Sequence, residues 1–483
     1  MKRDTSFSRE RRLSGTPLAR PRQMAGILAR AICLTLGPCA HAAVLAQEAT
    51  PPQQPPAAPP VPSANAYPID LPTTLRLAGA QNLDVQLART AVDEAHANYT
   101  SAIEGFLPTL VPGASYLKHT GRDQEVQGDL IDVTKHSQLA GVTAAAEIPV
   151  GDAIFQSLQS RQLVTAADAT QAAQEQDTGL AAAQQYFNLV NSRALVEVVS
   201  QALGVSQNYE QQLNEAVTIG TAFKGDAFRV QTQTRRLQLQ LTRAKAQQRL
   251  AATELAQTLH LDPLVELVPA EREPAPFAFS DLNDPPEALV RRALDRRPEI
   301  ARSTAQIAAA EEARRGALYG PLIPTLGGRA FVGEMDGGAG DTNLNGGPRR
   351  DLGVGLSWKI GPGGLFDFGR IKASNAQLTR AQVIDEKVRD AIQREVVDAY
   401  TQVQSLFQQM RDARLNVSSA EETLRLTRGR KQLGVGTVLE DIQAQQDLLN
   451  ARSDLVTIVT QLNQAQYSLM RSVGSPLRAP AAK

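Results

Sequence analysis

This chain has little cysteine, few aromatic residues and no net charge, and each scarcity excludes a class of protein. Both cysteines, Cys33 and Cys39, lie near the N-terminus, so the long remainder of the chain holds no disulfide and no thiol site. Aromatic residues make up 4% of the chain, which favours slender helices with thin apolar seams over a thick globular core. The formal net charge is zero, so nothing indicates nucleic-acid binding.

Signatures of catalysis and of cofactor binding are missing as well. None of the five histidines has the spacing of a metal-ligand set; they are His41, His96, His119, His136 and His260. Asp367-Phe368-Gly369 copies a kinase triplet, but the catalytic loop and the glycine-rich lysine strand of a kinase are absent. Gly353-Val354-Gly355 and Gly434-Val435-Gly436 lack the third glycine of a dinucleotide loop. We expect no enzyme, no cofactor and no metal site.

Residues 1–46 are typical of an export signal, with either Met1 or Met24 as the start. From Met24 the sequence has an early arginine, a short apolar stretch and small residues that end at Ala46. Pro38 stands where a lipoprotein signal needs a small residue before Cys39, which disfavours a lipid anchor. The alternative interpretation is a cytosolic protein with a basic, disordered N-terminal tail.

Residues 47–69 are rich in proline and are expected to form an extended tether with no packed structure. After this tether the chain contains no apolar run of about 18 residues, the length that a membrane-spanning helix needs. No such helix is therefore expected in the mature protein.

Proline is absent from two stretches of equal length, Val150–Asp262 and Gly363–Ser475, although it is common elsewhere. Because proline breaks helix interiors, the two gaps predict long helical segments. Apolar residues in the second gap recur at about 3.6-residue spacing, the period of one helix face. They are Val388, Ile392, Val396, Tyr400, Val403, Phe407, Met410 and Val417.

The two proline-free stretches are copies of each other. A shift of 214 positions places Tyr186 on Tyr400 (400 − 186 = 214) with no gap along the stretch. The same shift matches three further pairs: Gly220 with Gly434, Asp226 with Glu440, and Gln231 with Gln445. An internal duplication of this length predicts one architecture built from two similar halves.

Each proline-free stretch is preceded by a helix and a hairpin. Helices are expected over 71–103 and 286–318, and each ends before a Pro-Thr-Leu triplet that starts at Pro108 or Pro324. Proline cannot continue a helix but tolerates the first position of a strand, so these two residues mark helix-to-strand junctions. Apolar residues then alternate with Gly353, Gly355 and small or polar residues; they are Leu352, Val354, Leu356, Trp358 and Ile360. This period of two predicts a strand with one apolar face.

The chain therefore divides into two structural repeats, 70–275 and 276–475, followed by a C-terminal tail, 476–483. Each repeat is helix, hairpin, long helix, turn and helix. The hairpins are expected at about 106–149 and about 322–361, and the turns at 220–226 and 434–440. The first long helix should span roughly 100 Å, since a helix rises about 1.5 Å per residue.

Two hairpins supply too few strands to close a barrel, and they leave open edges that invite pairing with another chain. Only helices or closed barrels span a bilayer. An exported chain with alternating strands and no apolar helix therefore points to a barrel that several subunits share.

At this point the sequence resembles the TolC-like family of outer-membrane efflux proteins. The resemblance covers about 70–473, nearly the whole mature chain. Segments 70–110 and 294–326 resemble the family's repeated first helix and its leucine–proline exit. Leu365–Arg370 resembles the start of the long helix, and 434–445 resembles the helix–turn–helix tip. The first long helix lacks the family's Asp-Gly pair, and Glu440 stands where the family usually has aspartate.

The resemblance implies a mainly α-helical fold with a membrane β-barrel. Three chains would form a homotrimer with a 12-stranded barrel and a periplasmic α-helical barrel. It further implies the outer membrane, with its lipid, as the location. The partners it implies are an inner-membrane transporter and a periplasmic adaptor protein at the lower end of the tunnel. The function it implies is a passive duct for efflux of small molecules or secretion of proteins.

The tip turns are the expected functional positions, for gating and adaptor contact. They contain Gly220, Asp226, Arg430, Gly434, Gly436 and Glu440. The glycines would supply left-handed caps, and the carboxylates would favour the positive ends of the returning helices. The resemblance implies charged links that hold the entrance shut, and Arg430 with Glu440 is the candidate pair. Capping alone, with solvated charges, is the alternative.

Three aromatic residues, Trp358, Phe331 and Tyr116, are candidates for the membrane interface, where amphipathic rings are favoured. Ordinary barrel packing is the alternative for these rings. The alternative function for the chain is a soluble periplasmic coiled-coil scaffold or adaptor. Such proteins also carry helical hairpins, but they need no pair of alternating strand hairpins at matching points.

Overall fold

The computed structural model describes residues 66–277, 279, 284–339, 345–433 and 435–479, which belong to one compact unit. The export signal expected at 1–46 and most of the tether lie outside the described residues. None of the helices in these ranges is both long enough and apolar enough to cross a membrane.

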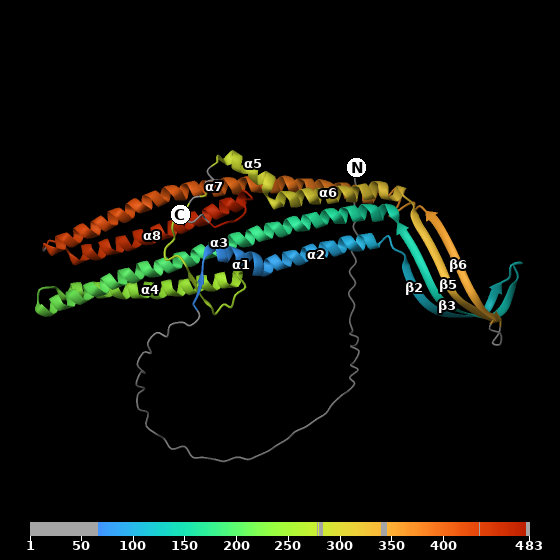
Figure 1. Cartoon of the computed structure of the whole chain (residues 1–483), viewed down its shortest axis with the longest axis horizontal. Helices are drawn as coiled ribbons and strands as arrows, with labels where there is room; N and C mark the ends of the chain where they lie inside the picture. The colour runs from blue at the N-terminus through green and yellow to red at the C-terminus, as the bar shows by residue number, and fades with distance from the viewer. Residues whose placement is uncertain (1–65, 278, 280–283, 340–344, 434, 480–483) are drawn as a thin grey trace, which may run out of the picture. The chain divides into compact units, whose positions relative to one another are not determined.

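Two long helices, α3 (Val150–Ile219) and α7 (Phe368–Gln432), organise the unit (Figure 1). With 70 residues, α3 spans about 105 Å, as the proline gap predicted. Shorter helices pack along each long helix, two before its hairpin and one after its tip turn. In the first half these are α1 (Leu71–Gln81), α2 (Leu83–Glu104) and α4 (Lys224–Thr258). In the second half they are α5 (Pro286–Arg296), α6 (Pro298–Tyr319) and α8 (Val438–Ser472).

The helices expected over 71–103 and 286–318 are each broken in two, which corrects the prediction. Asn82 ends α1 and caps α2, because its side chain accepts hydrogen bonds from Asp84 N at 2.8 Å and Val85 N at 3.3 Å. Arg297 breaks the second helix with an extended backbone, ψ 131°. The cause is Pro298, since a residue before proline avoids the helical region.

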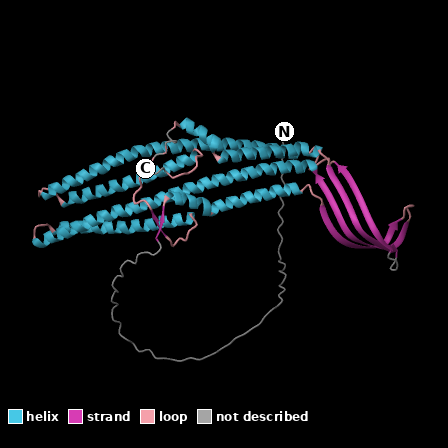
Figure 2. Ribbon diagram, viewed as in Figure 1, coloured by secondary structure: helices cyan, strands magenta, loops and turns pink. Residues whose placement is uncertain are grey.

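Four antiparallel strands form one sheet at the end of α2, α3, α6 and α7 (Figure 2). The strands are β2 (Thr109–Gln124), β3 (Leu130–Pro149), β5 (Thr325–Ala339) and β6 (Asn345–Ser357), in the order β2-β3-β5-β6. Both predicted hairpins are confirmed, and β3 pairs with β5 to join the two halves. The strand expected to reach Ile360 ends at Ser357, because its partner strand begins opposite, at Thr325.

The end of the expected tether is packed, which corrects that prediction. β1 (Ala66–Ile69) pairs in parallel with β4 (Glu266–Pro269), and the Ala270 N–H donates to the Ile69 carbonyl at 2.9 Å. Ile69 is 1% exposed and belongs to the main hydrophobic cluster. A single buried isoleucine after a proline-rich run leaves no periodic signal in the sequence.

The core is thin, as the low aromatic content suggested, and it is thickest near the middle of α3 and α7. Aromatic rings meet there, with Tyr467 edge to face on Phe277 and Phe279 and tilted against Phe187, at centroid distances of 5.6–6.0 Å. The seam predicted on α7 contributes Ile392, Val396, Val403 and Met410 as buried residues. Further along, the helices are held by small satellite clusters.

Candidate functional site: the helical tips and the sheet faces

The two tip turns lie at the end of the helices far from the sheet and pack against each other (Figure 1). One apolar cluster joins Tyr209 and Leu213 of α3 to Val230 of α4, with Val438 and Ile442 of α8 against it. The sequence prediction that the turns come together is borne out by these contacts.

Gly220 ends α3 with φ 84°, and its N–H donates to the Ala216 and Val217 carbonyls. This is the left-handed cap that the sequence predicted. Gly434 lies outside the described residues, and α7 is capped by Leu433 with φ −84°. Gly436 has a different role, because a Cβ there would lie 2.9 Å from the backbone nitrogen of Lys431. The close approach of the turn to the end of α7 therefore requires glycine at 436.

Both predicted carboxylates lie in the first turns of the returning helices. Glu440 completes a capping box: its backbone N–H donates to Thr437 Oγ1 at 3.2 Å, and Thr437 N–H donates to its carboxylate at 3.4 Å. Asp226 pairs with Arg229 at 3.0 Å. The Thr-x-x-Glu spacing of Thr437 and Glu440 was available in the sequence as a capping signal.

Arg430 and Glu440 are brought together, with 3.7 Å between Nη1 and Oε2. Their side chains are 60% and 44% exposed. Exposed ion pairs contribute roughly 0–1 kcal/mol, because water screens them and ordering two long side chains costs entropy. The pair also lies within one hairpin, between the end of α7 and the start of α8. It can stiffen that turn, but it does not join the two hairpins.

A buried acid next to this pair takes part in a link between the two hairpins, and no sequence pattern singled it out. Asp441 is 3% exposed, with Lys431 Nζ at 3.7 Å and Arg428 Nε at 3.9 Å from its carboxylate. Lys431 Nζ also lies 3.4 Å from the centroid of the Tyr209 ring on α3. A cation over an aromatic face is attracted to it, so Lys431 links α3 to the α7/α8 hairpin.

These four residues, Tyr209, Arg428, Lys431 and Asp441, form the tip cluster, and burial perturbs the pKa of Lys431 and of Tyr209. Desolvation lowers the pKa of Lys431, and the Asp441 carboxylate opposes that shift. The pKa of Tyr209 is raised, first by burial and then by the Asp441 and Asp226 carboxylates. Within the described residues, Tyr209 Oη and Asp441 Oδ1 are buried with no hydrogen-bond partner. Buried polar atoms of this kind make the cluster costly to disturb one partner at a time.

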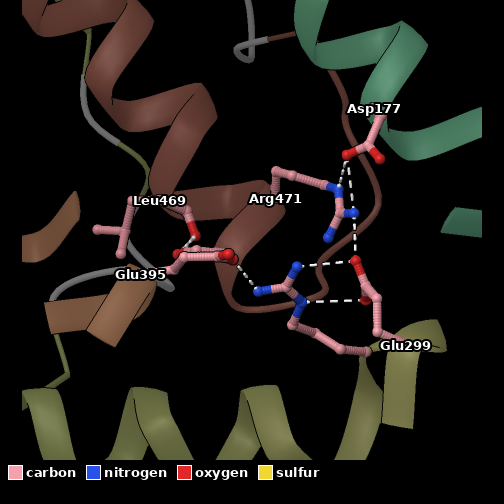
Figure 3. A network of polar contacts seen from close by, with 7 residues as sticks. Asp177, Glu299, Glu395, Leu469 and Arg471 are labelled. Atoms are coloured by element: carbon pink, nitrogen blue, oxygen red, sulfur yellow. Dashed lines mark hydrogen bonds and ion pairs between the residues drawn. The ribbon is translucent and has the colours of Figure 1, made fainter. Parts of the chain in front are cut away.

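A second buried charge cluster, the mid-helix network, lies where α3, α6, α7 and α8 meet (Figure 3). Glu299, in the first turn of α6, accepts hydrogen bonds from Arg471 of α8 at 2.5 Å and Arg297 at 2.8 Å. Arg471 also donates to Asp177 of α3 at 2.8 Å, and Arg297 donates to Glu395 of α7. Four helices are therefore tied together by two arginines that are 5% and 6% exposed.

Glu299 stays ionised in this buried setting. Burial pushes its pKa up, but the hydrogen bonds from Arg297 and Arg471 outweigh burial and lower the pKa from 4.5 to about 2. No sequence pattern identified the network, because Asp177 and Arg471 are 294 positions apart.

Pro108 and Pro324 stand directly before β2 and β5, so both are helix-to-strand junctions as predicted.

The strand register assigns each residue to one face of the sheet, because directly paired residues lie on the same face. Leu352 pairs with Ala330, and Ala330 pairs with Ala144. The same face carries Leu110, Tyr116, Val142, Leu326, Val332, Val354 and Leu356.

Phe331 does not belong with Tyr116 and Trp358, which corrects the interface prediction. It pairs with Asp351 on the opposite face and is 6% exposed. Its ring lies over Gly141 and Gly333, where a Cβ would come within 2.7 Å of the ring carbon Cζ. The two glycines have no side chains, so they leave room for the Phe331 ring. The ring packs against the sheet at these glycines and is buried there. Tyr116 is 61% exposed, on the face of Leu352.

Comparison with known proteins agrees with this architecture. The family model for outer membrane efflux protein matches residues 289–475, the second structural repeat. The outer membrane efflux protein BepC of Brucella suis is 24% identical over 69% of this chain and 72% of its own length. The pyoverdine export outer membrane protein OpmQ of Pseudomonas aeruginosa is 26% identical over 82% of this chain and 83% of its own length.

The fold is also that of solved outer-membrane channels. The Campylobacter jejuni CmeC outer membrane channel superposes with a TM-score of 0.71, over 84% of this chain and 85% of that one, at 16% identity. At that identity the likeness concerns the fold. Together with the family model that matches the second repeat and with the relatives, it identifies this chain as an outer-membrane channel that is similar to the TolC-like outer-membrane efflux proteins.

Proposed function

We propose that three copies of this chain form one channel and serve as the passive duct of a tripartite export system. The observation that carries the proposal is the open sheet, in which β2 and β6 are edge strands of the described chain. An unpaired edge is a template for another strand, and a sheet that spans a bilayer must have none. Pairing β6 of one copy with β2 of the next would close a 12-stranded barrel from three sheets of four strands.

The two faces of the sheet suit lipid outside and water inside. The face of Leu352, Val354 and Leu356 is apolar, and these side chains are 61–83% exposed. The opposite face of β6 carries Gly353, Gly355 and Ser357 in that stretch. In this stretch of β6, exposed apolar side chains on one face and small residues on the other are what a barrel wall in a bilayer needs.

The helical tips suit contact with a periplasmic adaptor protein, through which an inner-membrane transporter would deliver substrate. Several large apolar side chains are exposed there. They are Ile219, Phe223, Phe228, Leu433, Val435 and Leu439, which are 57–81% exposed. Contiguous exposed apolar side chains mark interaction surfaces in soluble regions. The cargo would be small molecules or proteins, carried through the tunnel without chemical change.

The alternative of a soluble periplasmic scaffold is set aside, because the matching family and relatives are outer-membrane proteins. The apolar face of the sheet points the same way, since a scaffold in water would gain nothing from it.

The protein should fractionate with the outer membrane and run as a trimer in mild detergent. The physical reason is the combination of open edges and an outward apolar face. The measurement is membrane fractionation followed by size-exclusion chromatography with light scattering. Recovery as a soluble monomer after lysis and a high-salt wash would contradict the proposed assembly.

Val354→Arg should reduce the yield of assembled trimer, whereas Gly355→Arg should leave it nearly unchanged. An arginine facing lipid costs on the order of 2–4 kcal/mol near the bilayer midplane. Gly355 is the matched control, because it is the next residue on the other face and a Cβ there meets nothing within 4 Å. The measurement is the trimer fraction in outer-membrane extracts. Equal yields from the two variants would show that this face does not meet lipid.

A further inference from the structure

Three helices lie along the outer edges of the described unit. α7 runs along one edge, and α2 and α4 run along the other (Figure 1). α2 and α4 are stacked end to end, and at their joint Asn82 Nδ2 donates to the Thr258 carbonyl at 2.9 Å. Within the chain, α2 and α4 pack mainly on α3, whereas α7 packs on α5, α6 and α8. Each of the three helices therefore has a face that points away from the rest of its own chain.

The outward faces carry large apolar side chains that are 50–68% exposed. They are Leu83 and Leu87 on α2, Phe228 and Leu239 on α4, and Val383, Leu415 and Leu426 on α7. Apolar side chains of this size stabilise a structure only when a neighbour removes them from water. Both edges of the unit therefore present surfaces that a partner could cover.

The two edges carry opposite charges at corresponding levels. α2 has four acidic side chains and one basic side chain, whereas α4 has seven basic and two acidic ones. Along α7 the order is reversed. Residues 368–394, which begin at the sheet, carry six basic and three acidic side chains, and residues 395–427 carry three basic and five acidic ones. The α2/α4 edge is thus negative near the sheet and positive near the tips, and the α7 edge has the opposite signs.

Individual charges on the two edges also match in height. Glu94 lies ten residues before the end of α2, and Arg380 lies twelve residues after the start of α7 (104 − 94 = 10, 380 − 368 = 12), so both are about 15–18 Å from the sheet. Arg243 lies nineteen residues after the start of α4, and Asp412 lies twenty residues before the end of α7 (243 − 224 = 19, 432 − 412 = 20). Both are therefore about 30 Å from the tip ends of their helices.

These four charges lie on the outward faces. Glu94 follows the buried Val92 by two residues, and Asp412 follows the buried Met410 by two residues, which is about half a turn of a helix in each case. All four side chains are exposed, and none of them makes an ion pair within the part of the chain that the structure describes. Their charges are therefore available to another molecule.

We propose that α7 of one copy packs against α2 and α4 of the next copy along a charge-matched seam, in which Arg380 faces Glu94 and Asp412 faces Arg243. The inference rests on the proposed function, because α7 follows β6 and α2 precedes β2, the two strands that would pair between copies. Since the signs reverse along the seam, a shifted or inverted approach would bring like charges together. The seam therefore sets the register between neighbouring copies.

A second copy is the partner that fits both edges. Apolar side chains match in height as the charges do: Leu87 and Val383 lie about 22–26 Å from the sheet, and Leu239 and Leu415 lie about 22–26 Å from the tip ends. The match covers both halves of α7 and continues the open edge of β6. An adaptor protein bound at the tips would not reach the half that lies beside the sheet.

Engineered cysteines test the seam directly, because no cysteine lies among residues 47–483. Ala376→Cys on α7 is combined with Ala97→Cys on α2, since both residues are exposed and lie about 10–12 Å from the sheet ends of their helices. Gln408→Cys on α7 is combined with Ala246→Cys on α4, about 33–36 Å from the tip ends. Oxidation of either detergent-solubilised variant should convert most of the protein into covalently linked trimers on a non-reducing gel.

The matched control combines Ala376→Cys with Ala246→Cys, which places the two cysteines at different heights. This variant and each single-cysteine variant should stay monomeric on the same gel. The native chain is sized in parallel by light scattering. A native trimer with no disulfide at either matched pair would overturn the seam alone and leave these faces to a different partner, such as the adaptor. A native monomer would overturn the proposed function and the seam with it.

Charge reversal tests the matched signs. Asp412→Arg should lower the trimer fraction in mild detergent several-fold, because it sets an arginine against Arg243 of the next copy. Adding Arg243→Glu should restore the native fraction. Arg380→Glu should likewise be restored by Glu94→Arg, but not by Arg243→Glu. The helical circular dichroism signal should equal that of the native chain throughout, because these side chains make no ion pair within the described chain.

Restoration at each height, with no restoration between the two heights, is the result expected of the seam. Two results would reject it. One is a loss of trimer that the matched reversal does not restore. The other is a single reversal that leaves the trimer fraction unchanged, since like charges held face to face must weaken the contact.

Discussion

Arg471→Met should destabilise the folded protein by on the order of 3–5 kcal/mol, the usual cost of removing one partner from a buried ion pair. Arg471 is 5% exposed and holds both Glu299 and Asp177. Methionine keeps much of the side-chain volume, so the loss comes from the charge and its hydrogen bonds. The measurement is unfolding of the detergent-solubilised protein, followed by the helical circular dichroism signal.

The matched control is Arg452→Met, on the same helix. Arg452 pairs with Glu421 at 2.8 Å, but their side chains are 40% and 49% exposed. Removing an exposed pair should cost about 0–1 kcal/mol. Similar losses from the two variants would mean that burial of the mid-helix network does not govern its contribution.

The same network predicts a dependence on acid. The pKa of Glu299 is about 2 in the folded chain, against 4.5 for an ordinary glutamate. A lowered carboxyl pKa gives stability that is fully present above about pH 4.5 and is lost as the pH falls towards 2. The difference corresponds to roughly 3 kcal/mol. Glu299→Gln should flatten the change in unfolding free energy across this window, and an unchanged slope would contradict the assignment.

The features that the sequence predicted well are those set by local chemistry. Proline placement located α3, α7 and the junctions at Pro108 and Pro324, since proline acts on its own residue and its neighbours. Alternation located the faces of β6, because side chains on a strand alternate whatever lies beyond it. The left-handed cap at Gly220 likewise follows from one residue.

The features that were missed depend on contacts between distant residues. Ile69 is buried only because β4 lies two hundred positions away, as the pairing Ile69 with Pro269 shows (269 − 69 = 200). Asp441 and Glu299 look like solvated helix charges in the sequence, and only the packing of several helices buries them. Pro298 could have predicted the break at Arg297, but the apolar spacing continued across this position and suggested a single helix.

Asp441→Asn should raise the open probability of the channel roughly tenfold or more while leaving the trimer intact. The proposed gate lies at the tips, and opening there requires the α7/α8 hairpin to move away from α3. The tip cluster resists that movement, because Lys431 contacts both Asp441 and the Tyr209 ring of α3. Asparagine keeps the size of the side chain but leaves Lys431 and Arg428 without their buried acid. If the substitution destabilises the closed state by about 1.4 kcal/mol, the equilibrium constant for opening rises tenfold.

Glu440→Gln is the matched control for this gate, because Glu440 is the neighbouring acid on α8. Its pair with Arg430 is exposed, so Glu440→Gln and Arg430→Ala should each change the opening equilibrium less than about fivefold. The measurement is single-channel recording in planar bilayers, with the trimer fraction checked by gel filtration. Adding Lys431→Met to Asp441→Asn should have less than the sum of the two separate effects, since both break one link. If Asp441→Asn conducts like the native channel, or no more than Glu440→Gln does, the tip cluster does not hold the gate, and Lys431 and Asp441 serve only to stabilise the hairpin.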